Sequence, residues 1–527
     1  MIKILTSLFA FFSIAAVHSQ SIQQTPKLVI GITIDQLRGD YLELFKDTFG
    51  DKGFKKLLNE GLVYSDVEFN FPYLDEASTT TTIYTGTNPT FHGIQGNSKY
   101  LIKQNKEVSS FADISSTINN ADDQLSPSPI IVSTLTDELS IASGDNSDIF
   151  SFAPNAISAL SSGGHTARGS YWVDDYNGRW ITSKYYNASY SFVEKHNGSN
   201  ESLYKKGLSL VWKPSMPIAN YDAFPYTRNI IDFQHQLGAT KNNRFHLLKQ
   251  SPFINSDVRK MAENALIENK LGTRTYPDFL SLTFYAGNYE NALDKNYSIE
   301  IQDIYYRLDQ ELAQLFETID KTIGLDNTLI FVVSTGYFNE QEIYPEGIKL
   351  SGGEFNPEKI RALLNMYLMA VYGQGEWVTK YYNQQYFLDR DLIEDKKIPL
   401  ADIQQIAAEF LVHSSGIHDV ITSHQMLHGA YNQTVQYYRN SYCKGVSGDL
   451  FVELQPGWSV VNDNSSTNIK TRSNAVISPA IFFGNNIKPQ RISTPIDATQ
   501  IAPSVAYRLR IRAPNASKGE ILKELLN

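Results

Sequence analysis

The chain has 527 residues, of which 42% are hydrophobic and 12% aromatic, and its formal net charge is −10 at pH 7. This composition is that of a large globular protein with a substantial core. Because the net charge is negative and no run of Lys or Arg stands out, nucleic acid and anionic membranes are not expected partners. Cys443 is the only cysteine, so no disulfide can form within the chain.

The first nineteen residues have the pattern of a secretory signal peptide. Lys3 supplies a positive start, residues 4–17 are apolar, and residues 17–19 resemble a cleavage site. No later apolar run reaches the roughly 18 residues needed to span a bilayer. We therefore expect an exported protein, periplasmic or secreted, without a transmembrane segment.

Residues 27–34 form an apolar stretch that predicts a buried strand, and Asp35 follows it directly. Open α/β sheets bind their ligands at the carboxyl ends of strands. Residues 71–86 contain a predicted helix start, where a reactive group would lie at the positive end of the helix dipole. The segment from Lys27 to Asn97 therefore predicts an active-site platform.

The elements that follow alternate between helices and strands. This order favours an α/β fold with a central, mostly parallel sheet flanked by helices. Apolar residues from 301 to 323 recur at helical spacing until Gly324, which is expected to end the helix. The predicted helices are 41–49, 53–61, 130–139 and 301–323, and the predicted strands are 62–70, 148–153, 279–284, 329–333, 449–454 and 480–483.

Two stretches depart from this alternation, and we interpret them as insertions. Residues 166–265 place Trp and Tyr among Asn, Gly and Ser, which is typical of a hairpin-rich cap. Residues 346–425 have a mainly helical pattern. The predicted core therefore comprises residues 27–165, 266–345 and 426–527.

Several motifs, taken in their order along the chain, resemble the alkaline phosphatase superfamily. The pattern is most similar to the bacterial phosphate-irrepressible alkaline phosphatases, which are relatives of the nucleotide pyrophosphatases and phosphodiesterases. The resemblance covers nearly the whole chain after the predicted signal peptide. The motifs are a strand followed by Asp35-Gln36-x-Arg38, then Ile83-Tyr84-Thr85-Gly86, Pro89-x-x-His92-Gly93-Ile94-x-Gly96-Asn97, Ser447-Gly448-Asp449-Leu450 with Pro456-Gly457-Trp458, and Asp497-x-Thr499-x-Ile501-Ala502-Pro503 before Pro514-x-x-Ser517.

The resemblance implies an alkaline-phosphatase-like sheet with inserted cap subdomains and a specific chemistry. Members of the superfamily attack a phosphate ester with a Thr or Ser bound between two zinc ions. The zinc ligands expected from it are an Asp after the first strand, the nucleophile itself, an Asp-x-x-x-His, an adjacent Asp-His pair and a late lone His. An Asn, a Lys and an Arg are expected to bind the phosphate oxygens.

Only two of these positions match. Asp35 corresponds to the first zinc ligand, and Asn97 corresponds to the Asn that donates to a phosphate oxygen. Glu76 occupies the nucleophile position. An alternative register that starts from residues 71–73 would place Ser78 there instead.

The remaining positions are replaced. No register restores the zinc histidines, because the sequence has no histidine between His246 and His413 and none after His428. The Asp-x-x-x-His falls on Asn288 and Ala292, the Asp-His pair on Thr335 and Gly336, and the Lys and Arg positions on Asn155 and Ile157.

Several of the candidate residues also have a structural interpretation. Glu76 would stabilise the first turn of a helix as well as bind a metal. Asp35 would serve equally well to cap the neighbouring loop or to pair with Arg38. His424 and His428 lie at i and i+4 of a predicted helix, which suits zinc, but no Glu accompanies them as in a metalloprotease motif.

We therefore expect a catalytically inactive member of the superfamily, without a cofactor, that acts as a binding or scaffolding subunit with a protein partner in the bacterial cell envelope. The alternative is an active phosphomonoesterase or phosphodiesterase with a reduced or atypical metal site. In that case zinc would be bound by a set built on Asp35, Glu76, Asn97 and Asn288.

Overall fold

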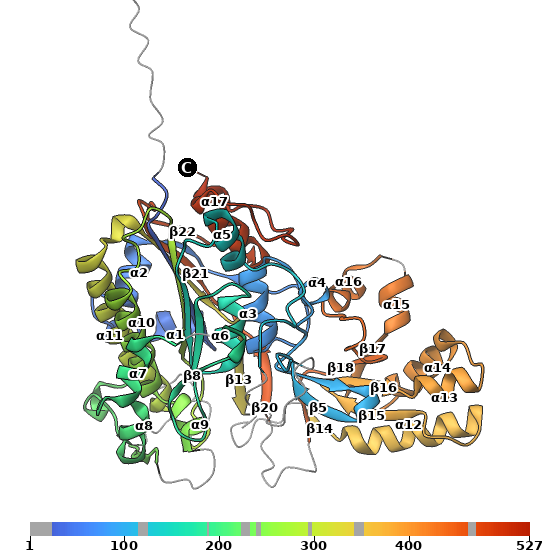
Figure 1. Ribbon diagram of the computed structural model, residues 1–527. Helices are drawn as coiled ribbons and strands as arrows, with labels where there is room; N and C mark the ends of the chain where they lie inside the picture. The colour runs from blue at the N-terminus through green and yellow to red at the C-terminus, as the bar shows by residue number, and fades with distance from the viewer. Residues whose placement is uncertain are drawn as a thin grey trace, which may run out of the picture.

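The computed structural model describes residues 24–113, 125–186, 189–222, 232–238, 244–292, 298–341, 352–429, 431–461 and 471–526. Within them, a nine-stranded sheet forms the centre of the molecule, in the order β22-β2-β21-β12-β1-β11-β6-β7-β8 (Figure 1). In this order the strands are Gln490–Ile492, Leu62–Tyr64, Ala480–Gly484, Thr328–Ser334, Leu28–Asp35, Asp278–Tyr285, Ile149–Ala153, Gly169–Val173 and Trp180–Thr182. The predicted signal peptide lies outside the described residues.

The strands from β12 to β7 are parallel to one another, whereas β21 and β8 run antiparallel to their neighbours. Helices cover both faces of this sheet (Figure 1). The prediction of an α/β fold with a mostly parallel central sheet is confirmed. On one face lie α1 (Gly39–Leu44), α2 (Phe54–Glu60), α10 (Pro252–Glu268) and α11 (Ile299–Thr322), and on the other α3 (Glu76–Thr85), α5 (Leu135–Ser143), α6 (Ala156–Gly163) and α17 (Ile501–Leu509).

Side chains of β1 alternate between these two layers, because successive residues of a strand point to opposite faces. Ile30, Ile32 and Ile34 enter the core on the α11 side, and Val29 packs in the core that contains α3. Asp35 lies an even number of residues from Val29, so its side chain points to the same face of the sheet as that of Val29. The carboxyl end of β1 therefore presents an acid toward the start of α3.

The expected cap begins inside the central sheet, since β7 and β8 both lie within residues 166–265. Most of the remaining described part is helical, with α7 (Ser191–Gly198), α8 (Leu203–Lys206), α9 (Arg244–Lys249) and α10, and only a short β9 (Val211–Trp212) and β10 (His235–Gln236) pair. The hairpin-rich interpretation is wrong for this remaining part, because its described residues are mainly helical. The indole nitrogens of Trp180 and Trp212 donate to Asp257 and Asp303, each at 2.7 Å.

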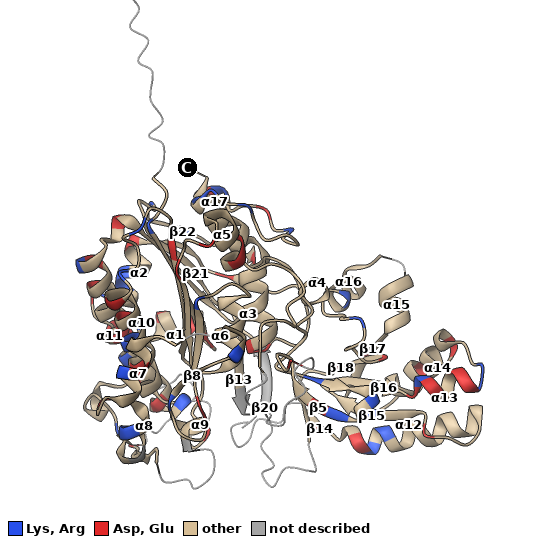
Figure 2. Cartoon of the chain, in the orientation of Figure 1, with Lys and Arg blue, Asp and Glu red and all other residues tan. Residues whose placement is uncertain are grey.

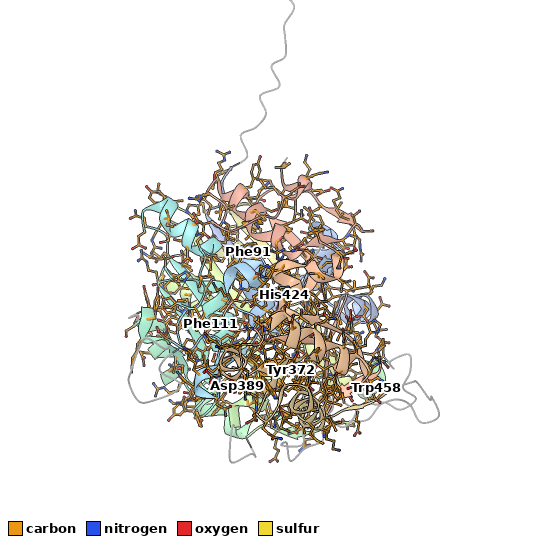
Figure 3. The ribbon with its side chains drawn as sticks, turned by 90° about the vertical axis from the view of Figure 1, so that its right-hand side faces the viewer. Phe91, Phe111, Tyr372, Asp389, His424 and Trp458 are labelled. Atoms are coloured by element: carbon orange, nitrogen blue, oxygen red, sulfur yellow. The ribbon has the colours of Figure 1, made fainter. Side chains whose placement is uncertain are left out.

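A smaller subdomain lies beside the central sheet (Figure 1), and Figure 3 shows it from its own side, with the labelled Tyr372, Asp389 and Trp458 belonging to it. It contains a four-stranded sheet, so the mainly helical interpretation of residues 346–425 is only partly correct. The strand predicted at 449–454 pairs within this sheet rather than with the core. Its strands in spatial order are β15 (Val378–Tyr382), β16 (Gln385–Leu388), β18 (Leu450–Leu454) and β17 (Ile417–Thr422), and its helices include α12 (Pro357–Tyr372), α13 (Arg390–Asp395) and α14 (Leu400–Val412).

Two further observations concern the helices. The predicted helix at 301–323 is α11, and it ends before Gly324, whose φ of 87° suits a residue without a side chain. Among the described residues, no helix is both long and apolar enough to span a bilayer.

Candidate functional site

A cavity of about 750 Å³ lies where the central strands end. Parallel strands have their carboxyl ends at the same edge of the sheet, so residues that follow different strands converge there. Asp35 and Gln36 come from the end of β1, Tyr285 from β11, Asn155 from the turn after β6, Trp172 and Asp174 from β7, and Tyr337 from the segment after β12. The cavity therefore lies at the strand end where the sequence predicted an active-site platform around Asp35.

Glu76 is the first residue of α3, and its side chain lines the cavity. Its Oε1 accepts a hydrogen bond from the Ser158 hydroxyl at 2.6 Å, and its Oε2 accepts one from the Asn155 amide at 3.1 Å. The carboxyl group is thus fixed by neutral donors from α6 and from the residue before it. Only 6% of Glu76 is exposed.

Ser78 does not line the cavity. Its backbone N–H donates to Asp75 Oδ1 at 3.0 Å, its hydroxyl donates to the same oxygen at 2.9 Å, and the Asp75 N–H donates back to the hydroxyl at 3.2 Å. This reciprocal arrangement is a capping box at the start of α3. Of the two alternatives for the nucleophile position, Glu76 is the one whose side chain enters the cavity.

Asp35 is bound by hydroxyl groups. Its Oδ1 accepts hydrogen bonds from Thr335 Oγ1 and from the Tyr337 hydroxyl, each at 3.0 Å. The alternative pairing with Arg38 is not observed, since Arg38 forms an ion pair with Asp40 at 2.7 Å. Asp35 instead connects the end of β1 to the segment that follows β12.

The other expected positions divide into two groups. Asn97 and Asn288 line the cavity, as do Asn155 and Ile157. Asn97 Oδ1 accepts from the Ala77 N–H at 2.9 Å, and Asn288 Nδ2 donates to the Asn339 carbonyl at 2.7 Å.

Thr335 and Gly336 do not line the cavity. The Thr335 hydroxyl donates a hydrogen bond to Asp35, whereas the Gly336 N–H donates to Ser334 Oγ at 3.1 Å. Ala292, the second position of the Asp-x-x-x-His motif, is buried in the apolar core.

Burial disfavours the charged forms of both acids. It raises the pKa of Asp35 from 3.8 to about 6, although the hydrogen bonds from Tyr337 and Thr335 act in the opposite direction. Burial also raises the pKa of Glu76 from 4.5 to about 7, and the negative charge of Asp35 contributes to that rise. The charge of Asp35 thus opposes ionisation of Glu76, and the charge of Asp75 opposes ionisation of Asp35.

These residues do not fit the two-zinc site that the resemblance implied. Zinc in proteins requires several thiolate, imidazole or carboxylate ligands in a tetrahedral set. The lost ligand positions carry Asn288, Ala292, Thr335 and Gly336. The two carboxyl groups that remain, Asp35 and Glu76, both accept hydrogen bonds from neutral side chains. The described part of the chain contains no cluster of three or more His, Cys, Asp or Glu side chains suited to a metal.

His424 and His428 lie away from this cavity, on α15 (Ser423–His428). Their ring centroids are 4.9 Å apart, and both residues are exposed. They do not belong to a larger metal-binding cluster within the described residues. A zinc site at this pair therefore has only two ligands to offer.

Sequence reasoning missed several residues of the site. Lys249, Tyr285 and Tyr337 all line the cavity, and none belongs to a recognisable motif. Lys249 comes from α9 in the expected cap, and its Nζ lies 2.7 Å from Asp175 Oδ1. Tyr337 alone had an available signal, since it follows Thr335 by two residues at the end of a predicted strand.

Comparison with known proteins gives one consistent result. The family model described as type I phosphodiesterase / nucleotide pyrophosphatase matches residues 29–476. Alkaline phosphatase PhoV of Synechococcus elongatus is 29% identical over 95% of this chain and 93% of its own length. Alkaline phosphatase PafA of Elizabethkingia meningoseptica is 27% identical over 95% of this chain and 94% of its own.

Two further matches span nearly the entire chain. A protein of Myroides odoratus named calcium-transporting ATPase is 28% identical over 99% of this chain and 98% of its own. The crystal structure of wild-type PafA matches with a TM-score of 0.82 and 25% identity, covering 96% of this chain and 99% of PafA.

Proposed function

Because the chain belongs to the type I phosphodiesterase / nucleotide pyrophosphatase family, we propose that it is a family member that does not hydrolyse phosphate esters and whose cavity binds another ligand. One observation carries this proposal. Tyr337 and Thr335 donate hydroxyl hydrogen bonds to Asp35 at the place where the resemblance implied a zinc ion.

The residue at the nucleophile position supports the same conclusion. Glu76 has no hydroxyl to form an alkoxide, and both of its oxygens already accept hydrogen bonds. A phosphate dianion that approached an ionised carboxylate to about 4 Å would be opposed by about 4 kcal/mol per pair of unit charges at an effective dielectric constant of about 20. The site therefore disfavours the substrate class that the family is known for.

The positions expected to bind phosphate oxygens carry no positive charge. Asn155 donates its amide to Glu76, and Ile157 is apolar. Lys249 lines the cavity but forms an ion pair with Asp175. Phosphoryl transfer depends on positioning and on charge stabilisation, and the described residues offer little of either to a phosphate group.

The alternative function is an active phosphomonoesterase or phosphodiesterase with an atypical metal site. The names of PhoV and PafA support phosphatase chemistry for relatives. One observation in this chain favours the alternative: Asn288 Oδ1 is buried beside the cavity and has no hydrogen-bond partner among the described residues. Together with Asp35 and Glu76 it would offer a hard cation three oxygen ligands.

Metal analysis separates these two functions. The purified full-length protein is equilibrated with zinc, passed through a desalting column and analysed for bound metal, alongside the Asp35→Ala variant. The proposal predicts that both proteins retain far less than one zinc per chain. Stoichiometric zinc that disappears in Asp35→Ala would support the atypical enzyme instead.

We also propose that the protein acts in the bacterial cell envelope together with a protein partner. The signal-like start of the sequence motivates the location. The outer face of α12 motivates the partner, because Leu363, Met366 and Val371 are 50%, 62% and 45% exposed. Exposed apolar side chains at helical spacing are typical of interaction surfaces.

The charge distribution around this face favours a protein over a lipid surface. Residues 362–375 contain no Lys, Arg, Asp or Glu, and α12 is accordingly uncharged along most of its length in Figure 2. Helices that lie on anionic membranes flank their apolar face with Lys and Arg. We therefore propose that the partner is a protein with an apolar surface complementary to α12.

A further inference from the structure

The acidic side chains around the cavity outnumber the basic ones. Asp35, Glu76, Asp174, Asp175 and Glu290 line it, against Lys249 and His246. The two basic groups are matched, since Lys249 lies 2.7 Å from Asp175 and His246 lies 3.6 Å from Glu290. This leaves an excess of acidic groups for a ligand to neutralise.

Asp35 and Glu76 form no ion pair with a described residue, and Lys249, which pairs with Asp175, acts on Glu76 only as a more distant charge. Their hydrogen-bond donors in the described residues are neutral hydroxyl and amide groups: Thr335 and Tyr337 for Asp35, Ser158 and Asn155 for Glu76. No Lys, Arg or His of the described chain lies within ion-pair distance of either acid. A carboxylate can accept about four hydrogen bonds, so each group retains acceptor capacity.

Other groups around the cavity also favour a cation. The rings of Trp172, Tyr285 and Tyr337 line it, and aromatic faces attract ammonium groups. Asn288 Oδ1 supplies a further acceptor, because it is buried and has no partner among the described residues. The ligand that matches several acceptors, aromatic rings and excess negative charge is one with a protonated amine, which has three N–H donors and no acceptor.

We propose that the cavity binds a small organic cation whose ammonium group lies between Asp35 and Glu76. This inference rests on the proposed function, since it requires a site that is free of zinc and does not select phosphate. A volume of about 750 Å³ lies within the roughly 300–1,000 Å³ typical of small-molecule sites. Further amide side chains of the lining, among them Asn97, Asn155 and Asn339, are suited to bind hydroxyl groups on the body of such a ligand.

Competing ligand classes match fewer of these features. A neutral sugar would bind the amides and the aromatic rings but leave the two acids unneutralised. A phosphate monoester would add negative charge beside them. A divalent metal would satisfy the acids but would make no use of the aromatic side chains.

Isothermal titration calorimetry on the full-length protein at pH 7.5 tests this proposal with matched probes. Glucosamine is compared with glucose, spermidine is added as a flexible amine, and glucose 6-phosphate and calcium chloride serve as the anionic and metal probes. We expect at least one amine to bind at least tenfold more tightly than glucose and glucose 6-phosphate. The proposal is overturned if neither amine does so, or if calcium alone binds.

Two variants locate the site. Glu76→Gln and Asp35→Asn keep the size and most hydrogen-bonding capacity of each side chain, and each is expected to weaken amine binding at least tenfold. Glu68→Gln, an exposed acid outside the cavity, is the matched control and should bind as the wild type does. Unchanged affinity in both cavity variants would overturn the proposal. Failure of amine binding without zinc uptake or ester hydrolysis would leave the proposed function intact, whereas hydrolysis would reject both.

Discussion

The Tyr337 hydroxyl lies 3.0 Å from Asp35 Oδ1, and this contact connects the segment after β12 to the acid at the end of β1. Both groups are buried, with 4% of Tyr337 and 6% of Asp35 exposed. In a zinc hydrolase of this family the acid at this position is expected to bind metal. Here it accepts hydrogen bonds from side chains of the protein itself.

The first prediction concerns this contact. Tyr337→Phe removes one donor from a buried carboxylate, which costs about 1–3 kcal/mol. We expect the free energy of unfolding in urea at pH 7 to fall by about that amount. Tyr507→Phe, at a tyrosine that is 41% exposed, is the control and should change it by less than about 0.5 kcal/mol. Equal unfolding midpoints for both variants would show that the hydrogen bond contributes nothing.

The second prediction concerns pH. The pKa of Glu76 is about 7 in the folded protein and 4.5 when unperturbed, so the folded state binds more protons between these values. The free energy of unfolding therefore decreases as pH rises from about 4.5 to about 7, by about 3 kcal/mol from this group.

Glu76→Gln has no proton to release at this position, so we expect a smaller decrease of the unfolding free energy over the same pH range. Chemical unfolding at several pH values measures it, with Glu68→Gln as the control that should retain the wild-type slope. A slope in Glu76→Gln as steep as that of the wild type would contradict the raised pKa.

The third prediction separates Ser78 from the site. Ser78→Ala removes the hydroxyl of the capping box at the start of α3 and should destabilise the protein by about 1 kcal/mol. It should leave ligand affinity unchanged, because Ser78 does not line the cavity. Thermal unfolding and calorimetric titration measure the two effects. A stable Ser78→Ala variant that has lost binding would place Ser78 in the site.

The fourth prediction concerns α12. Leu363→Lys combined with Met366→Lys should leave the unfolding free energy within about 0.5 kcal/mol of wild type, because both side chains are half-exposed or more. The same change should abolish stoichiometric co-purification with a single envelope protein identified by mass spectrometry. Gln405→Lys, at an exposed polar position on α14, is the matched control. A partner retained by the double variant would place the interface elsewhere.

Much of the fold follows from local sequence patterns. The apolar stretch at 27–34 corresponds to β1, and the apolar stripe at 301–323 corresponds to α11. Both were predictable because the apolar residues that define each pattern are the ones buried in the core. The cap was harder to predict. Trp180 and Trp212 do lie in short strands, β8 and β9, but their indole groups donate to buried acids on α10 and α11, and no local pattern reveals that contact.

Part of the candidate site was also predictable from the sequence. Asp35 followed from the strand that precedes it, and the lack of histidines in the later strands was visible without a structure. The sequence did not reveal that the Glu76 side chain lines the cavity while the Ser78 hydroxyl belongs to a capping box. Tyr337 was not identified, because its role depends on β1 and β12 lying side by side in the sheet.

Ester hydrolysis in the presence of zinc distinguishes an inactive family member from an active enzyme. The purified full-length protein is incubated with p-nitrophenyl phosphate and with bis(p-nitrophenyl) phosphate, and release of nitrophenol is followed beside the same assay of an Asp35→Ala, Glu76→Ala double variant. We predict that the wild type and the double variant give the same background rate with both esters. Turnover by the wild type that is lost in the double variant would contradict this account and establish an active enzyme.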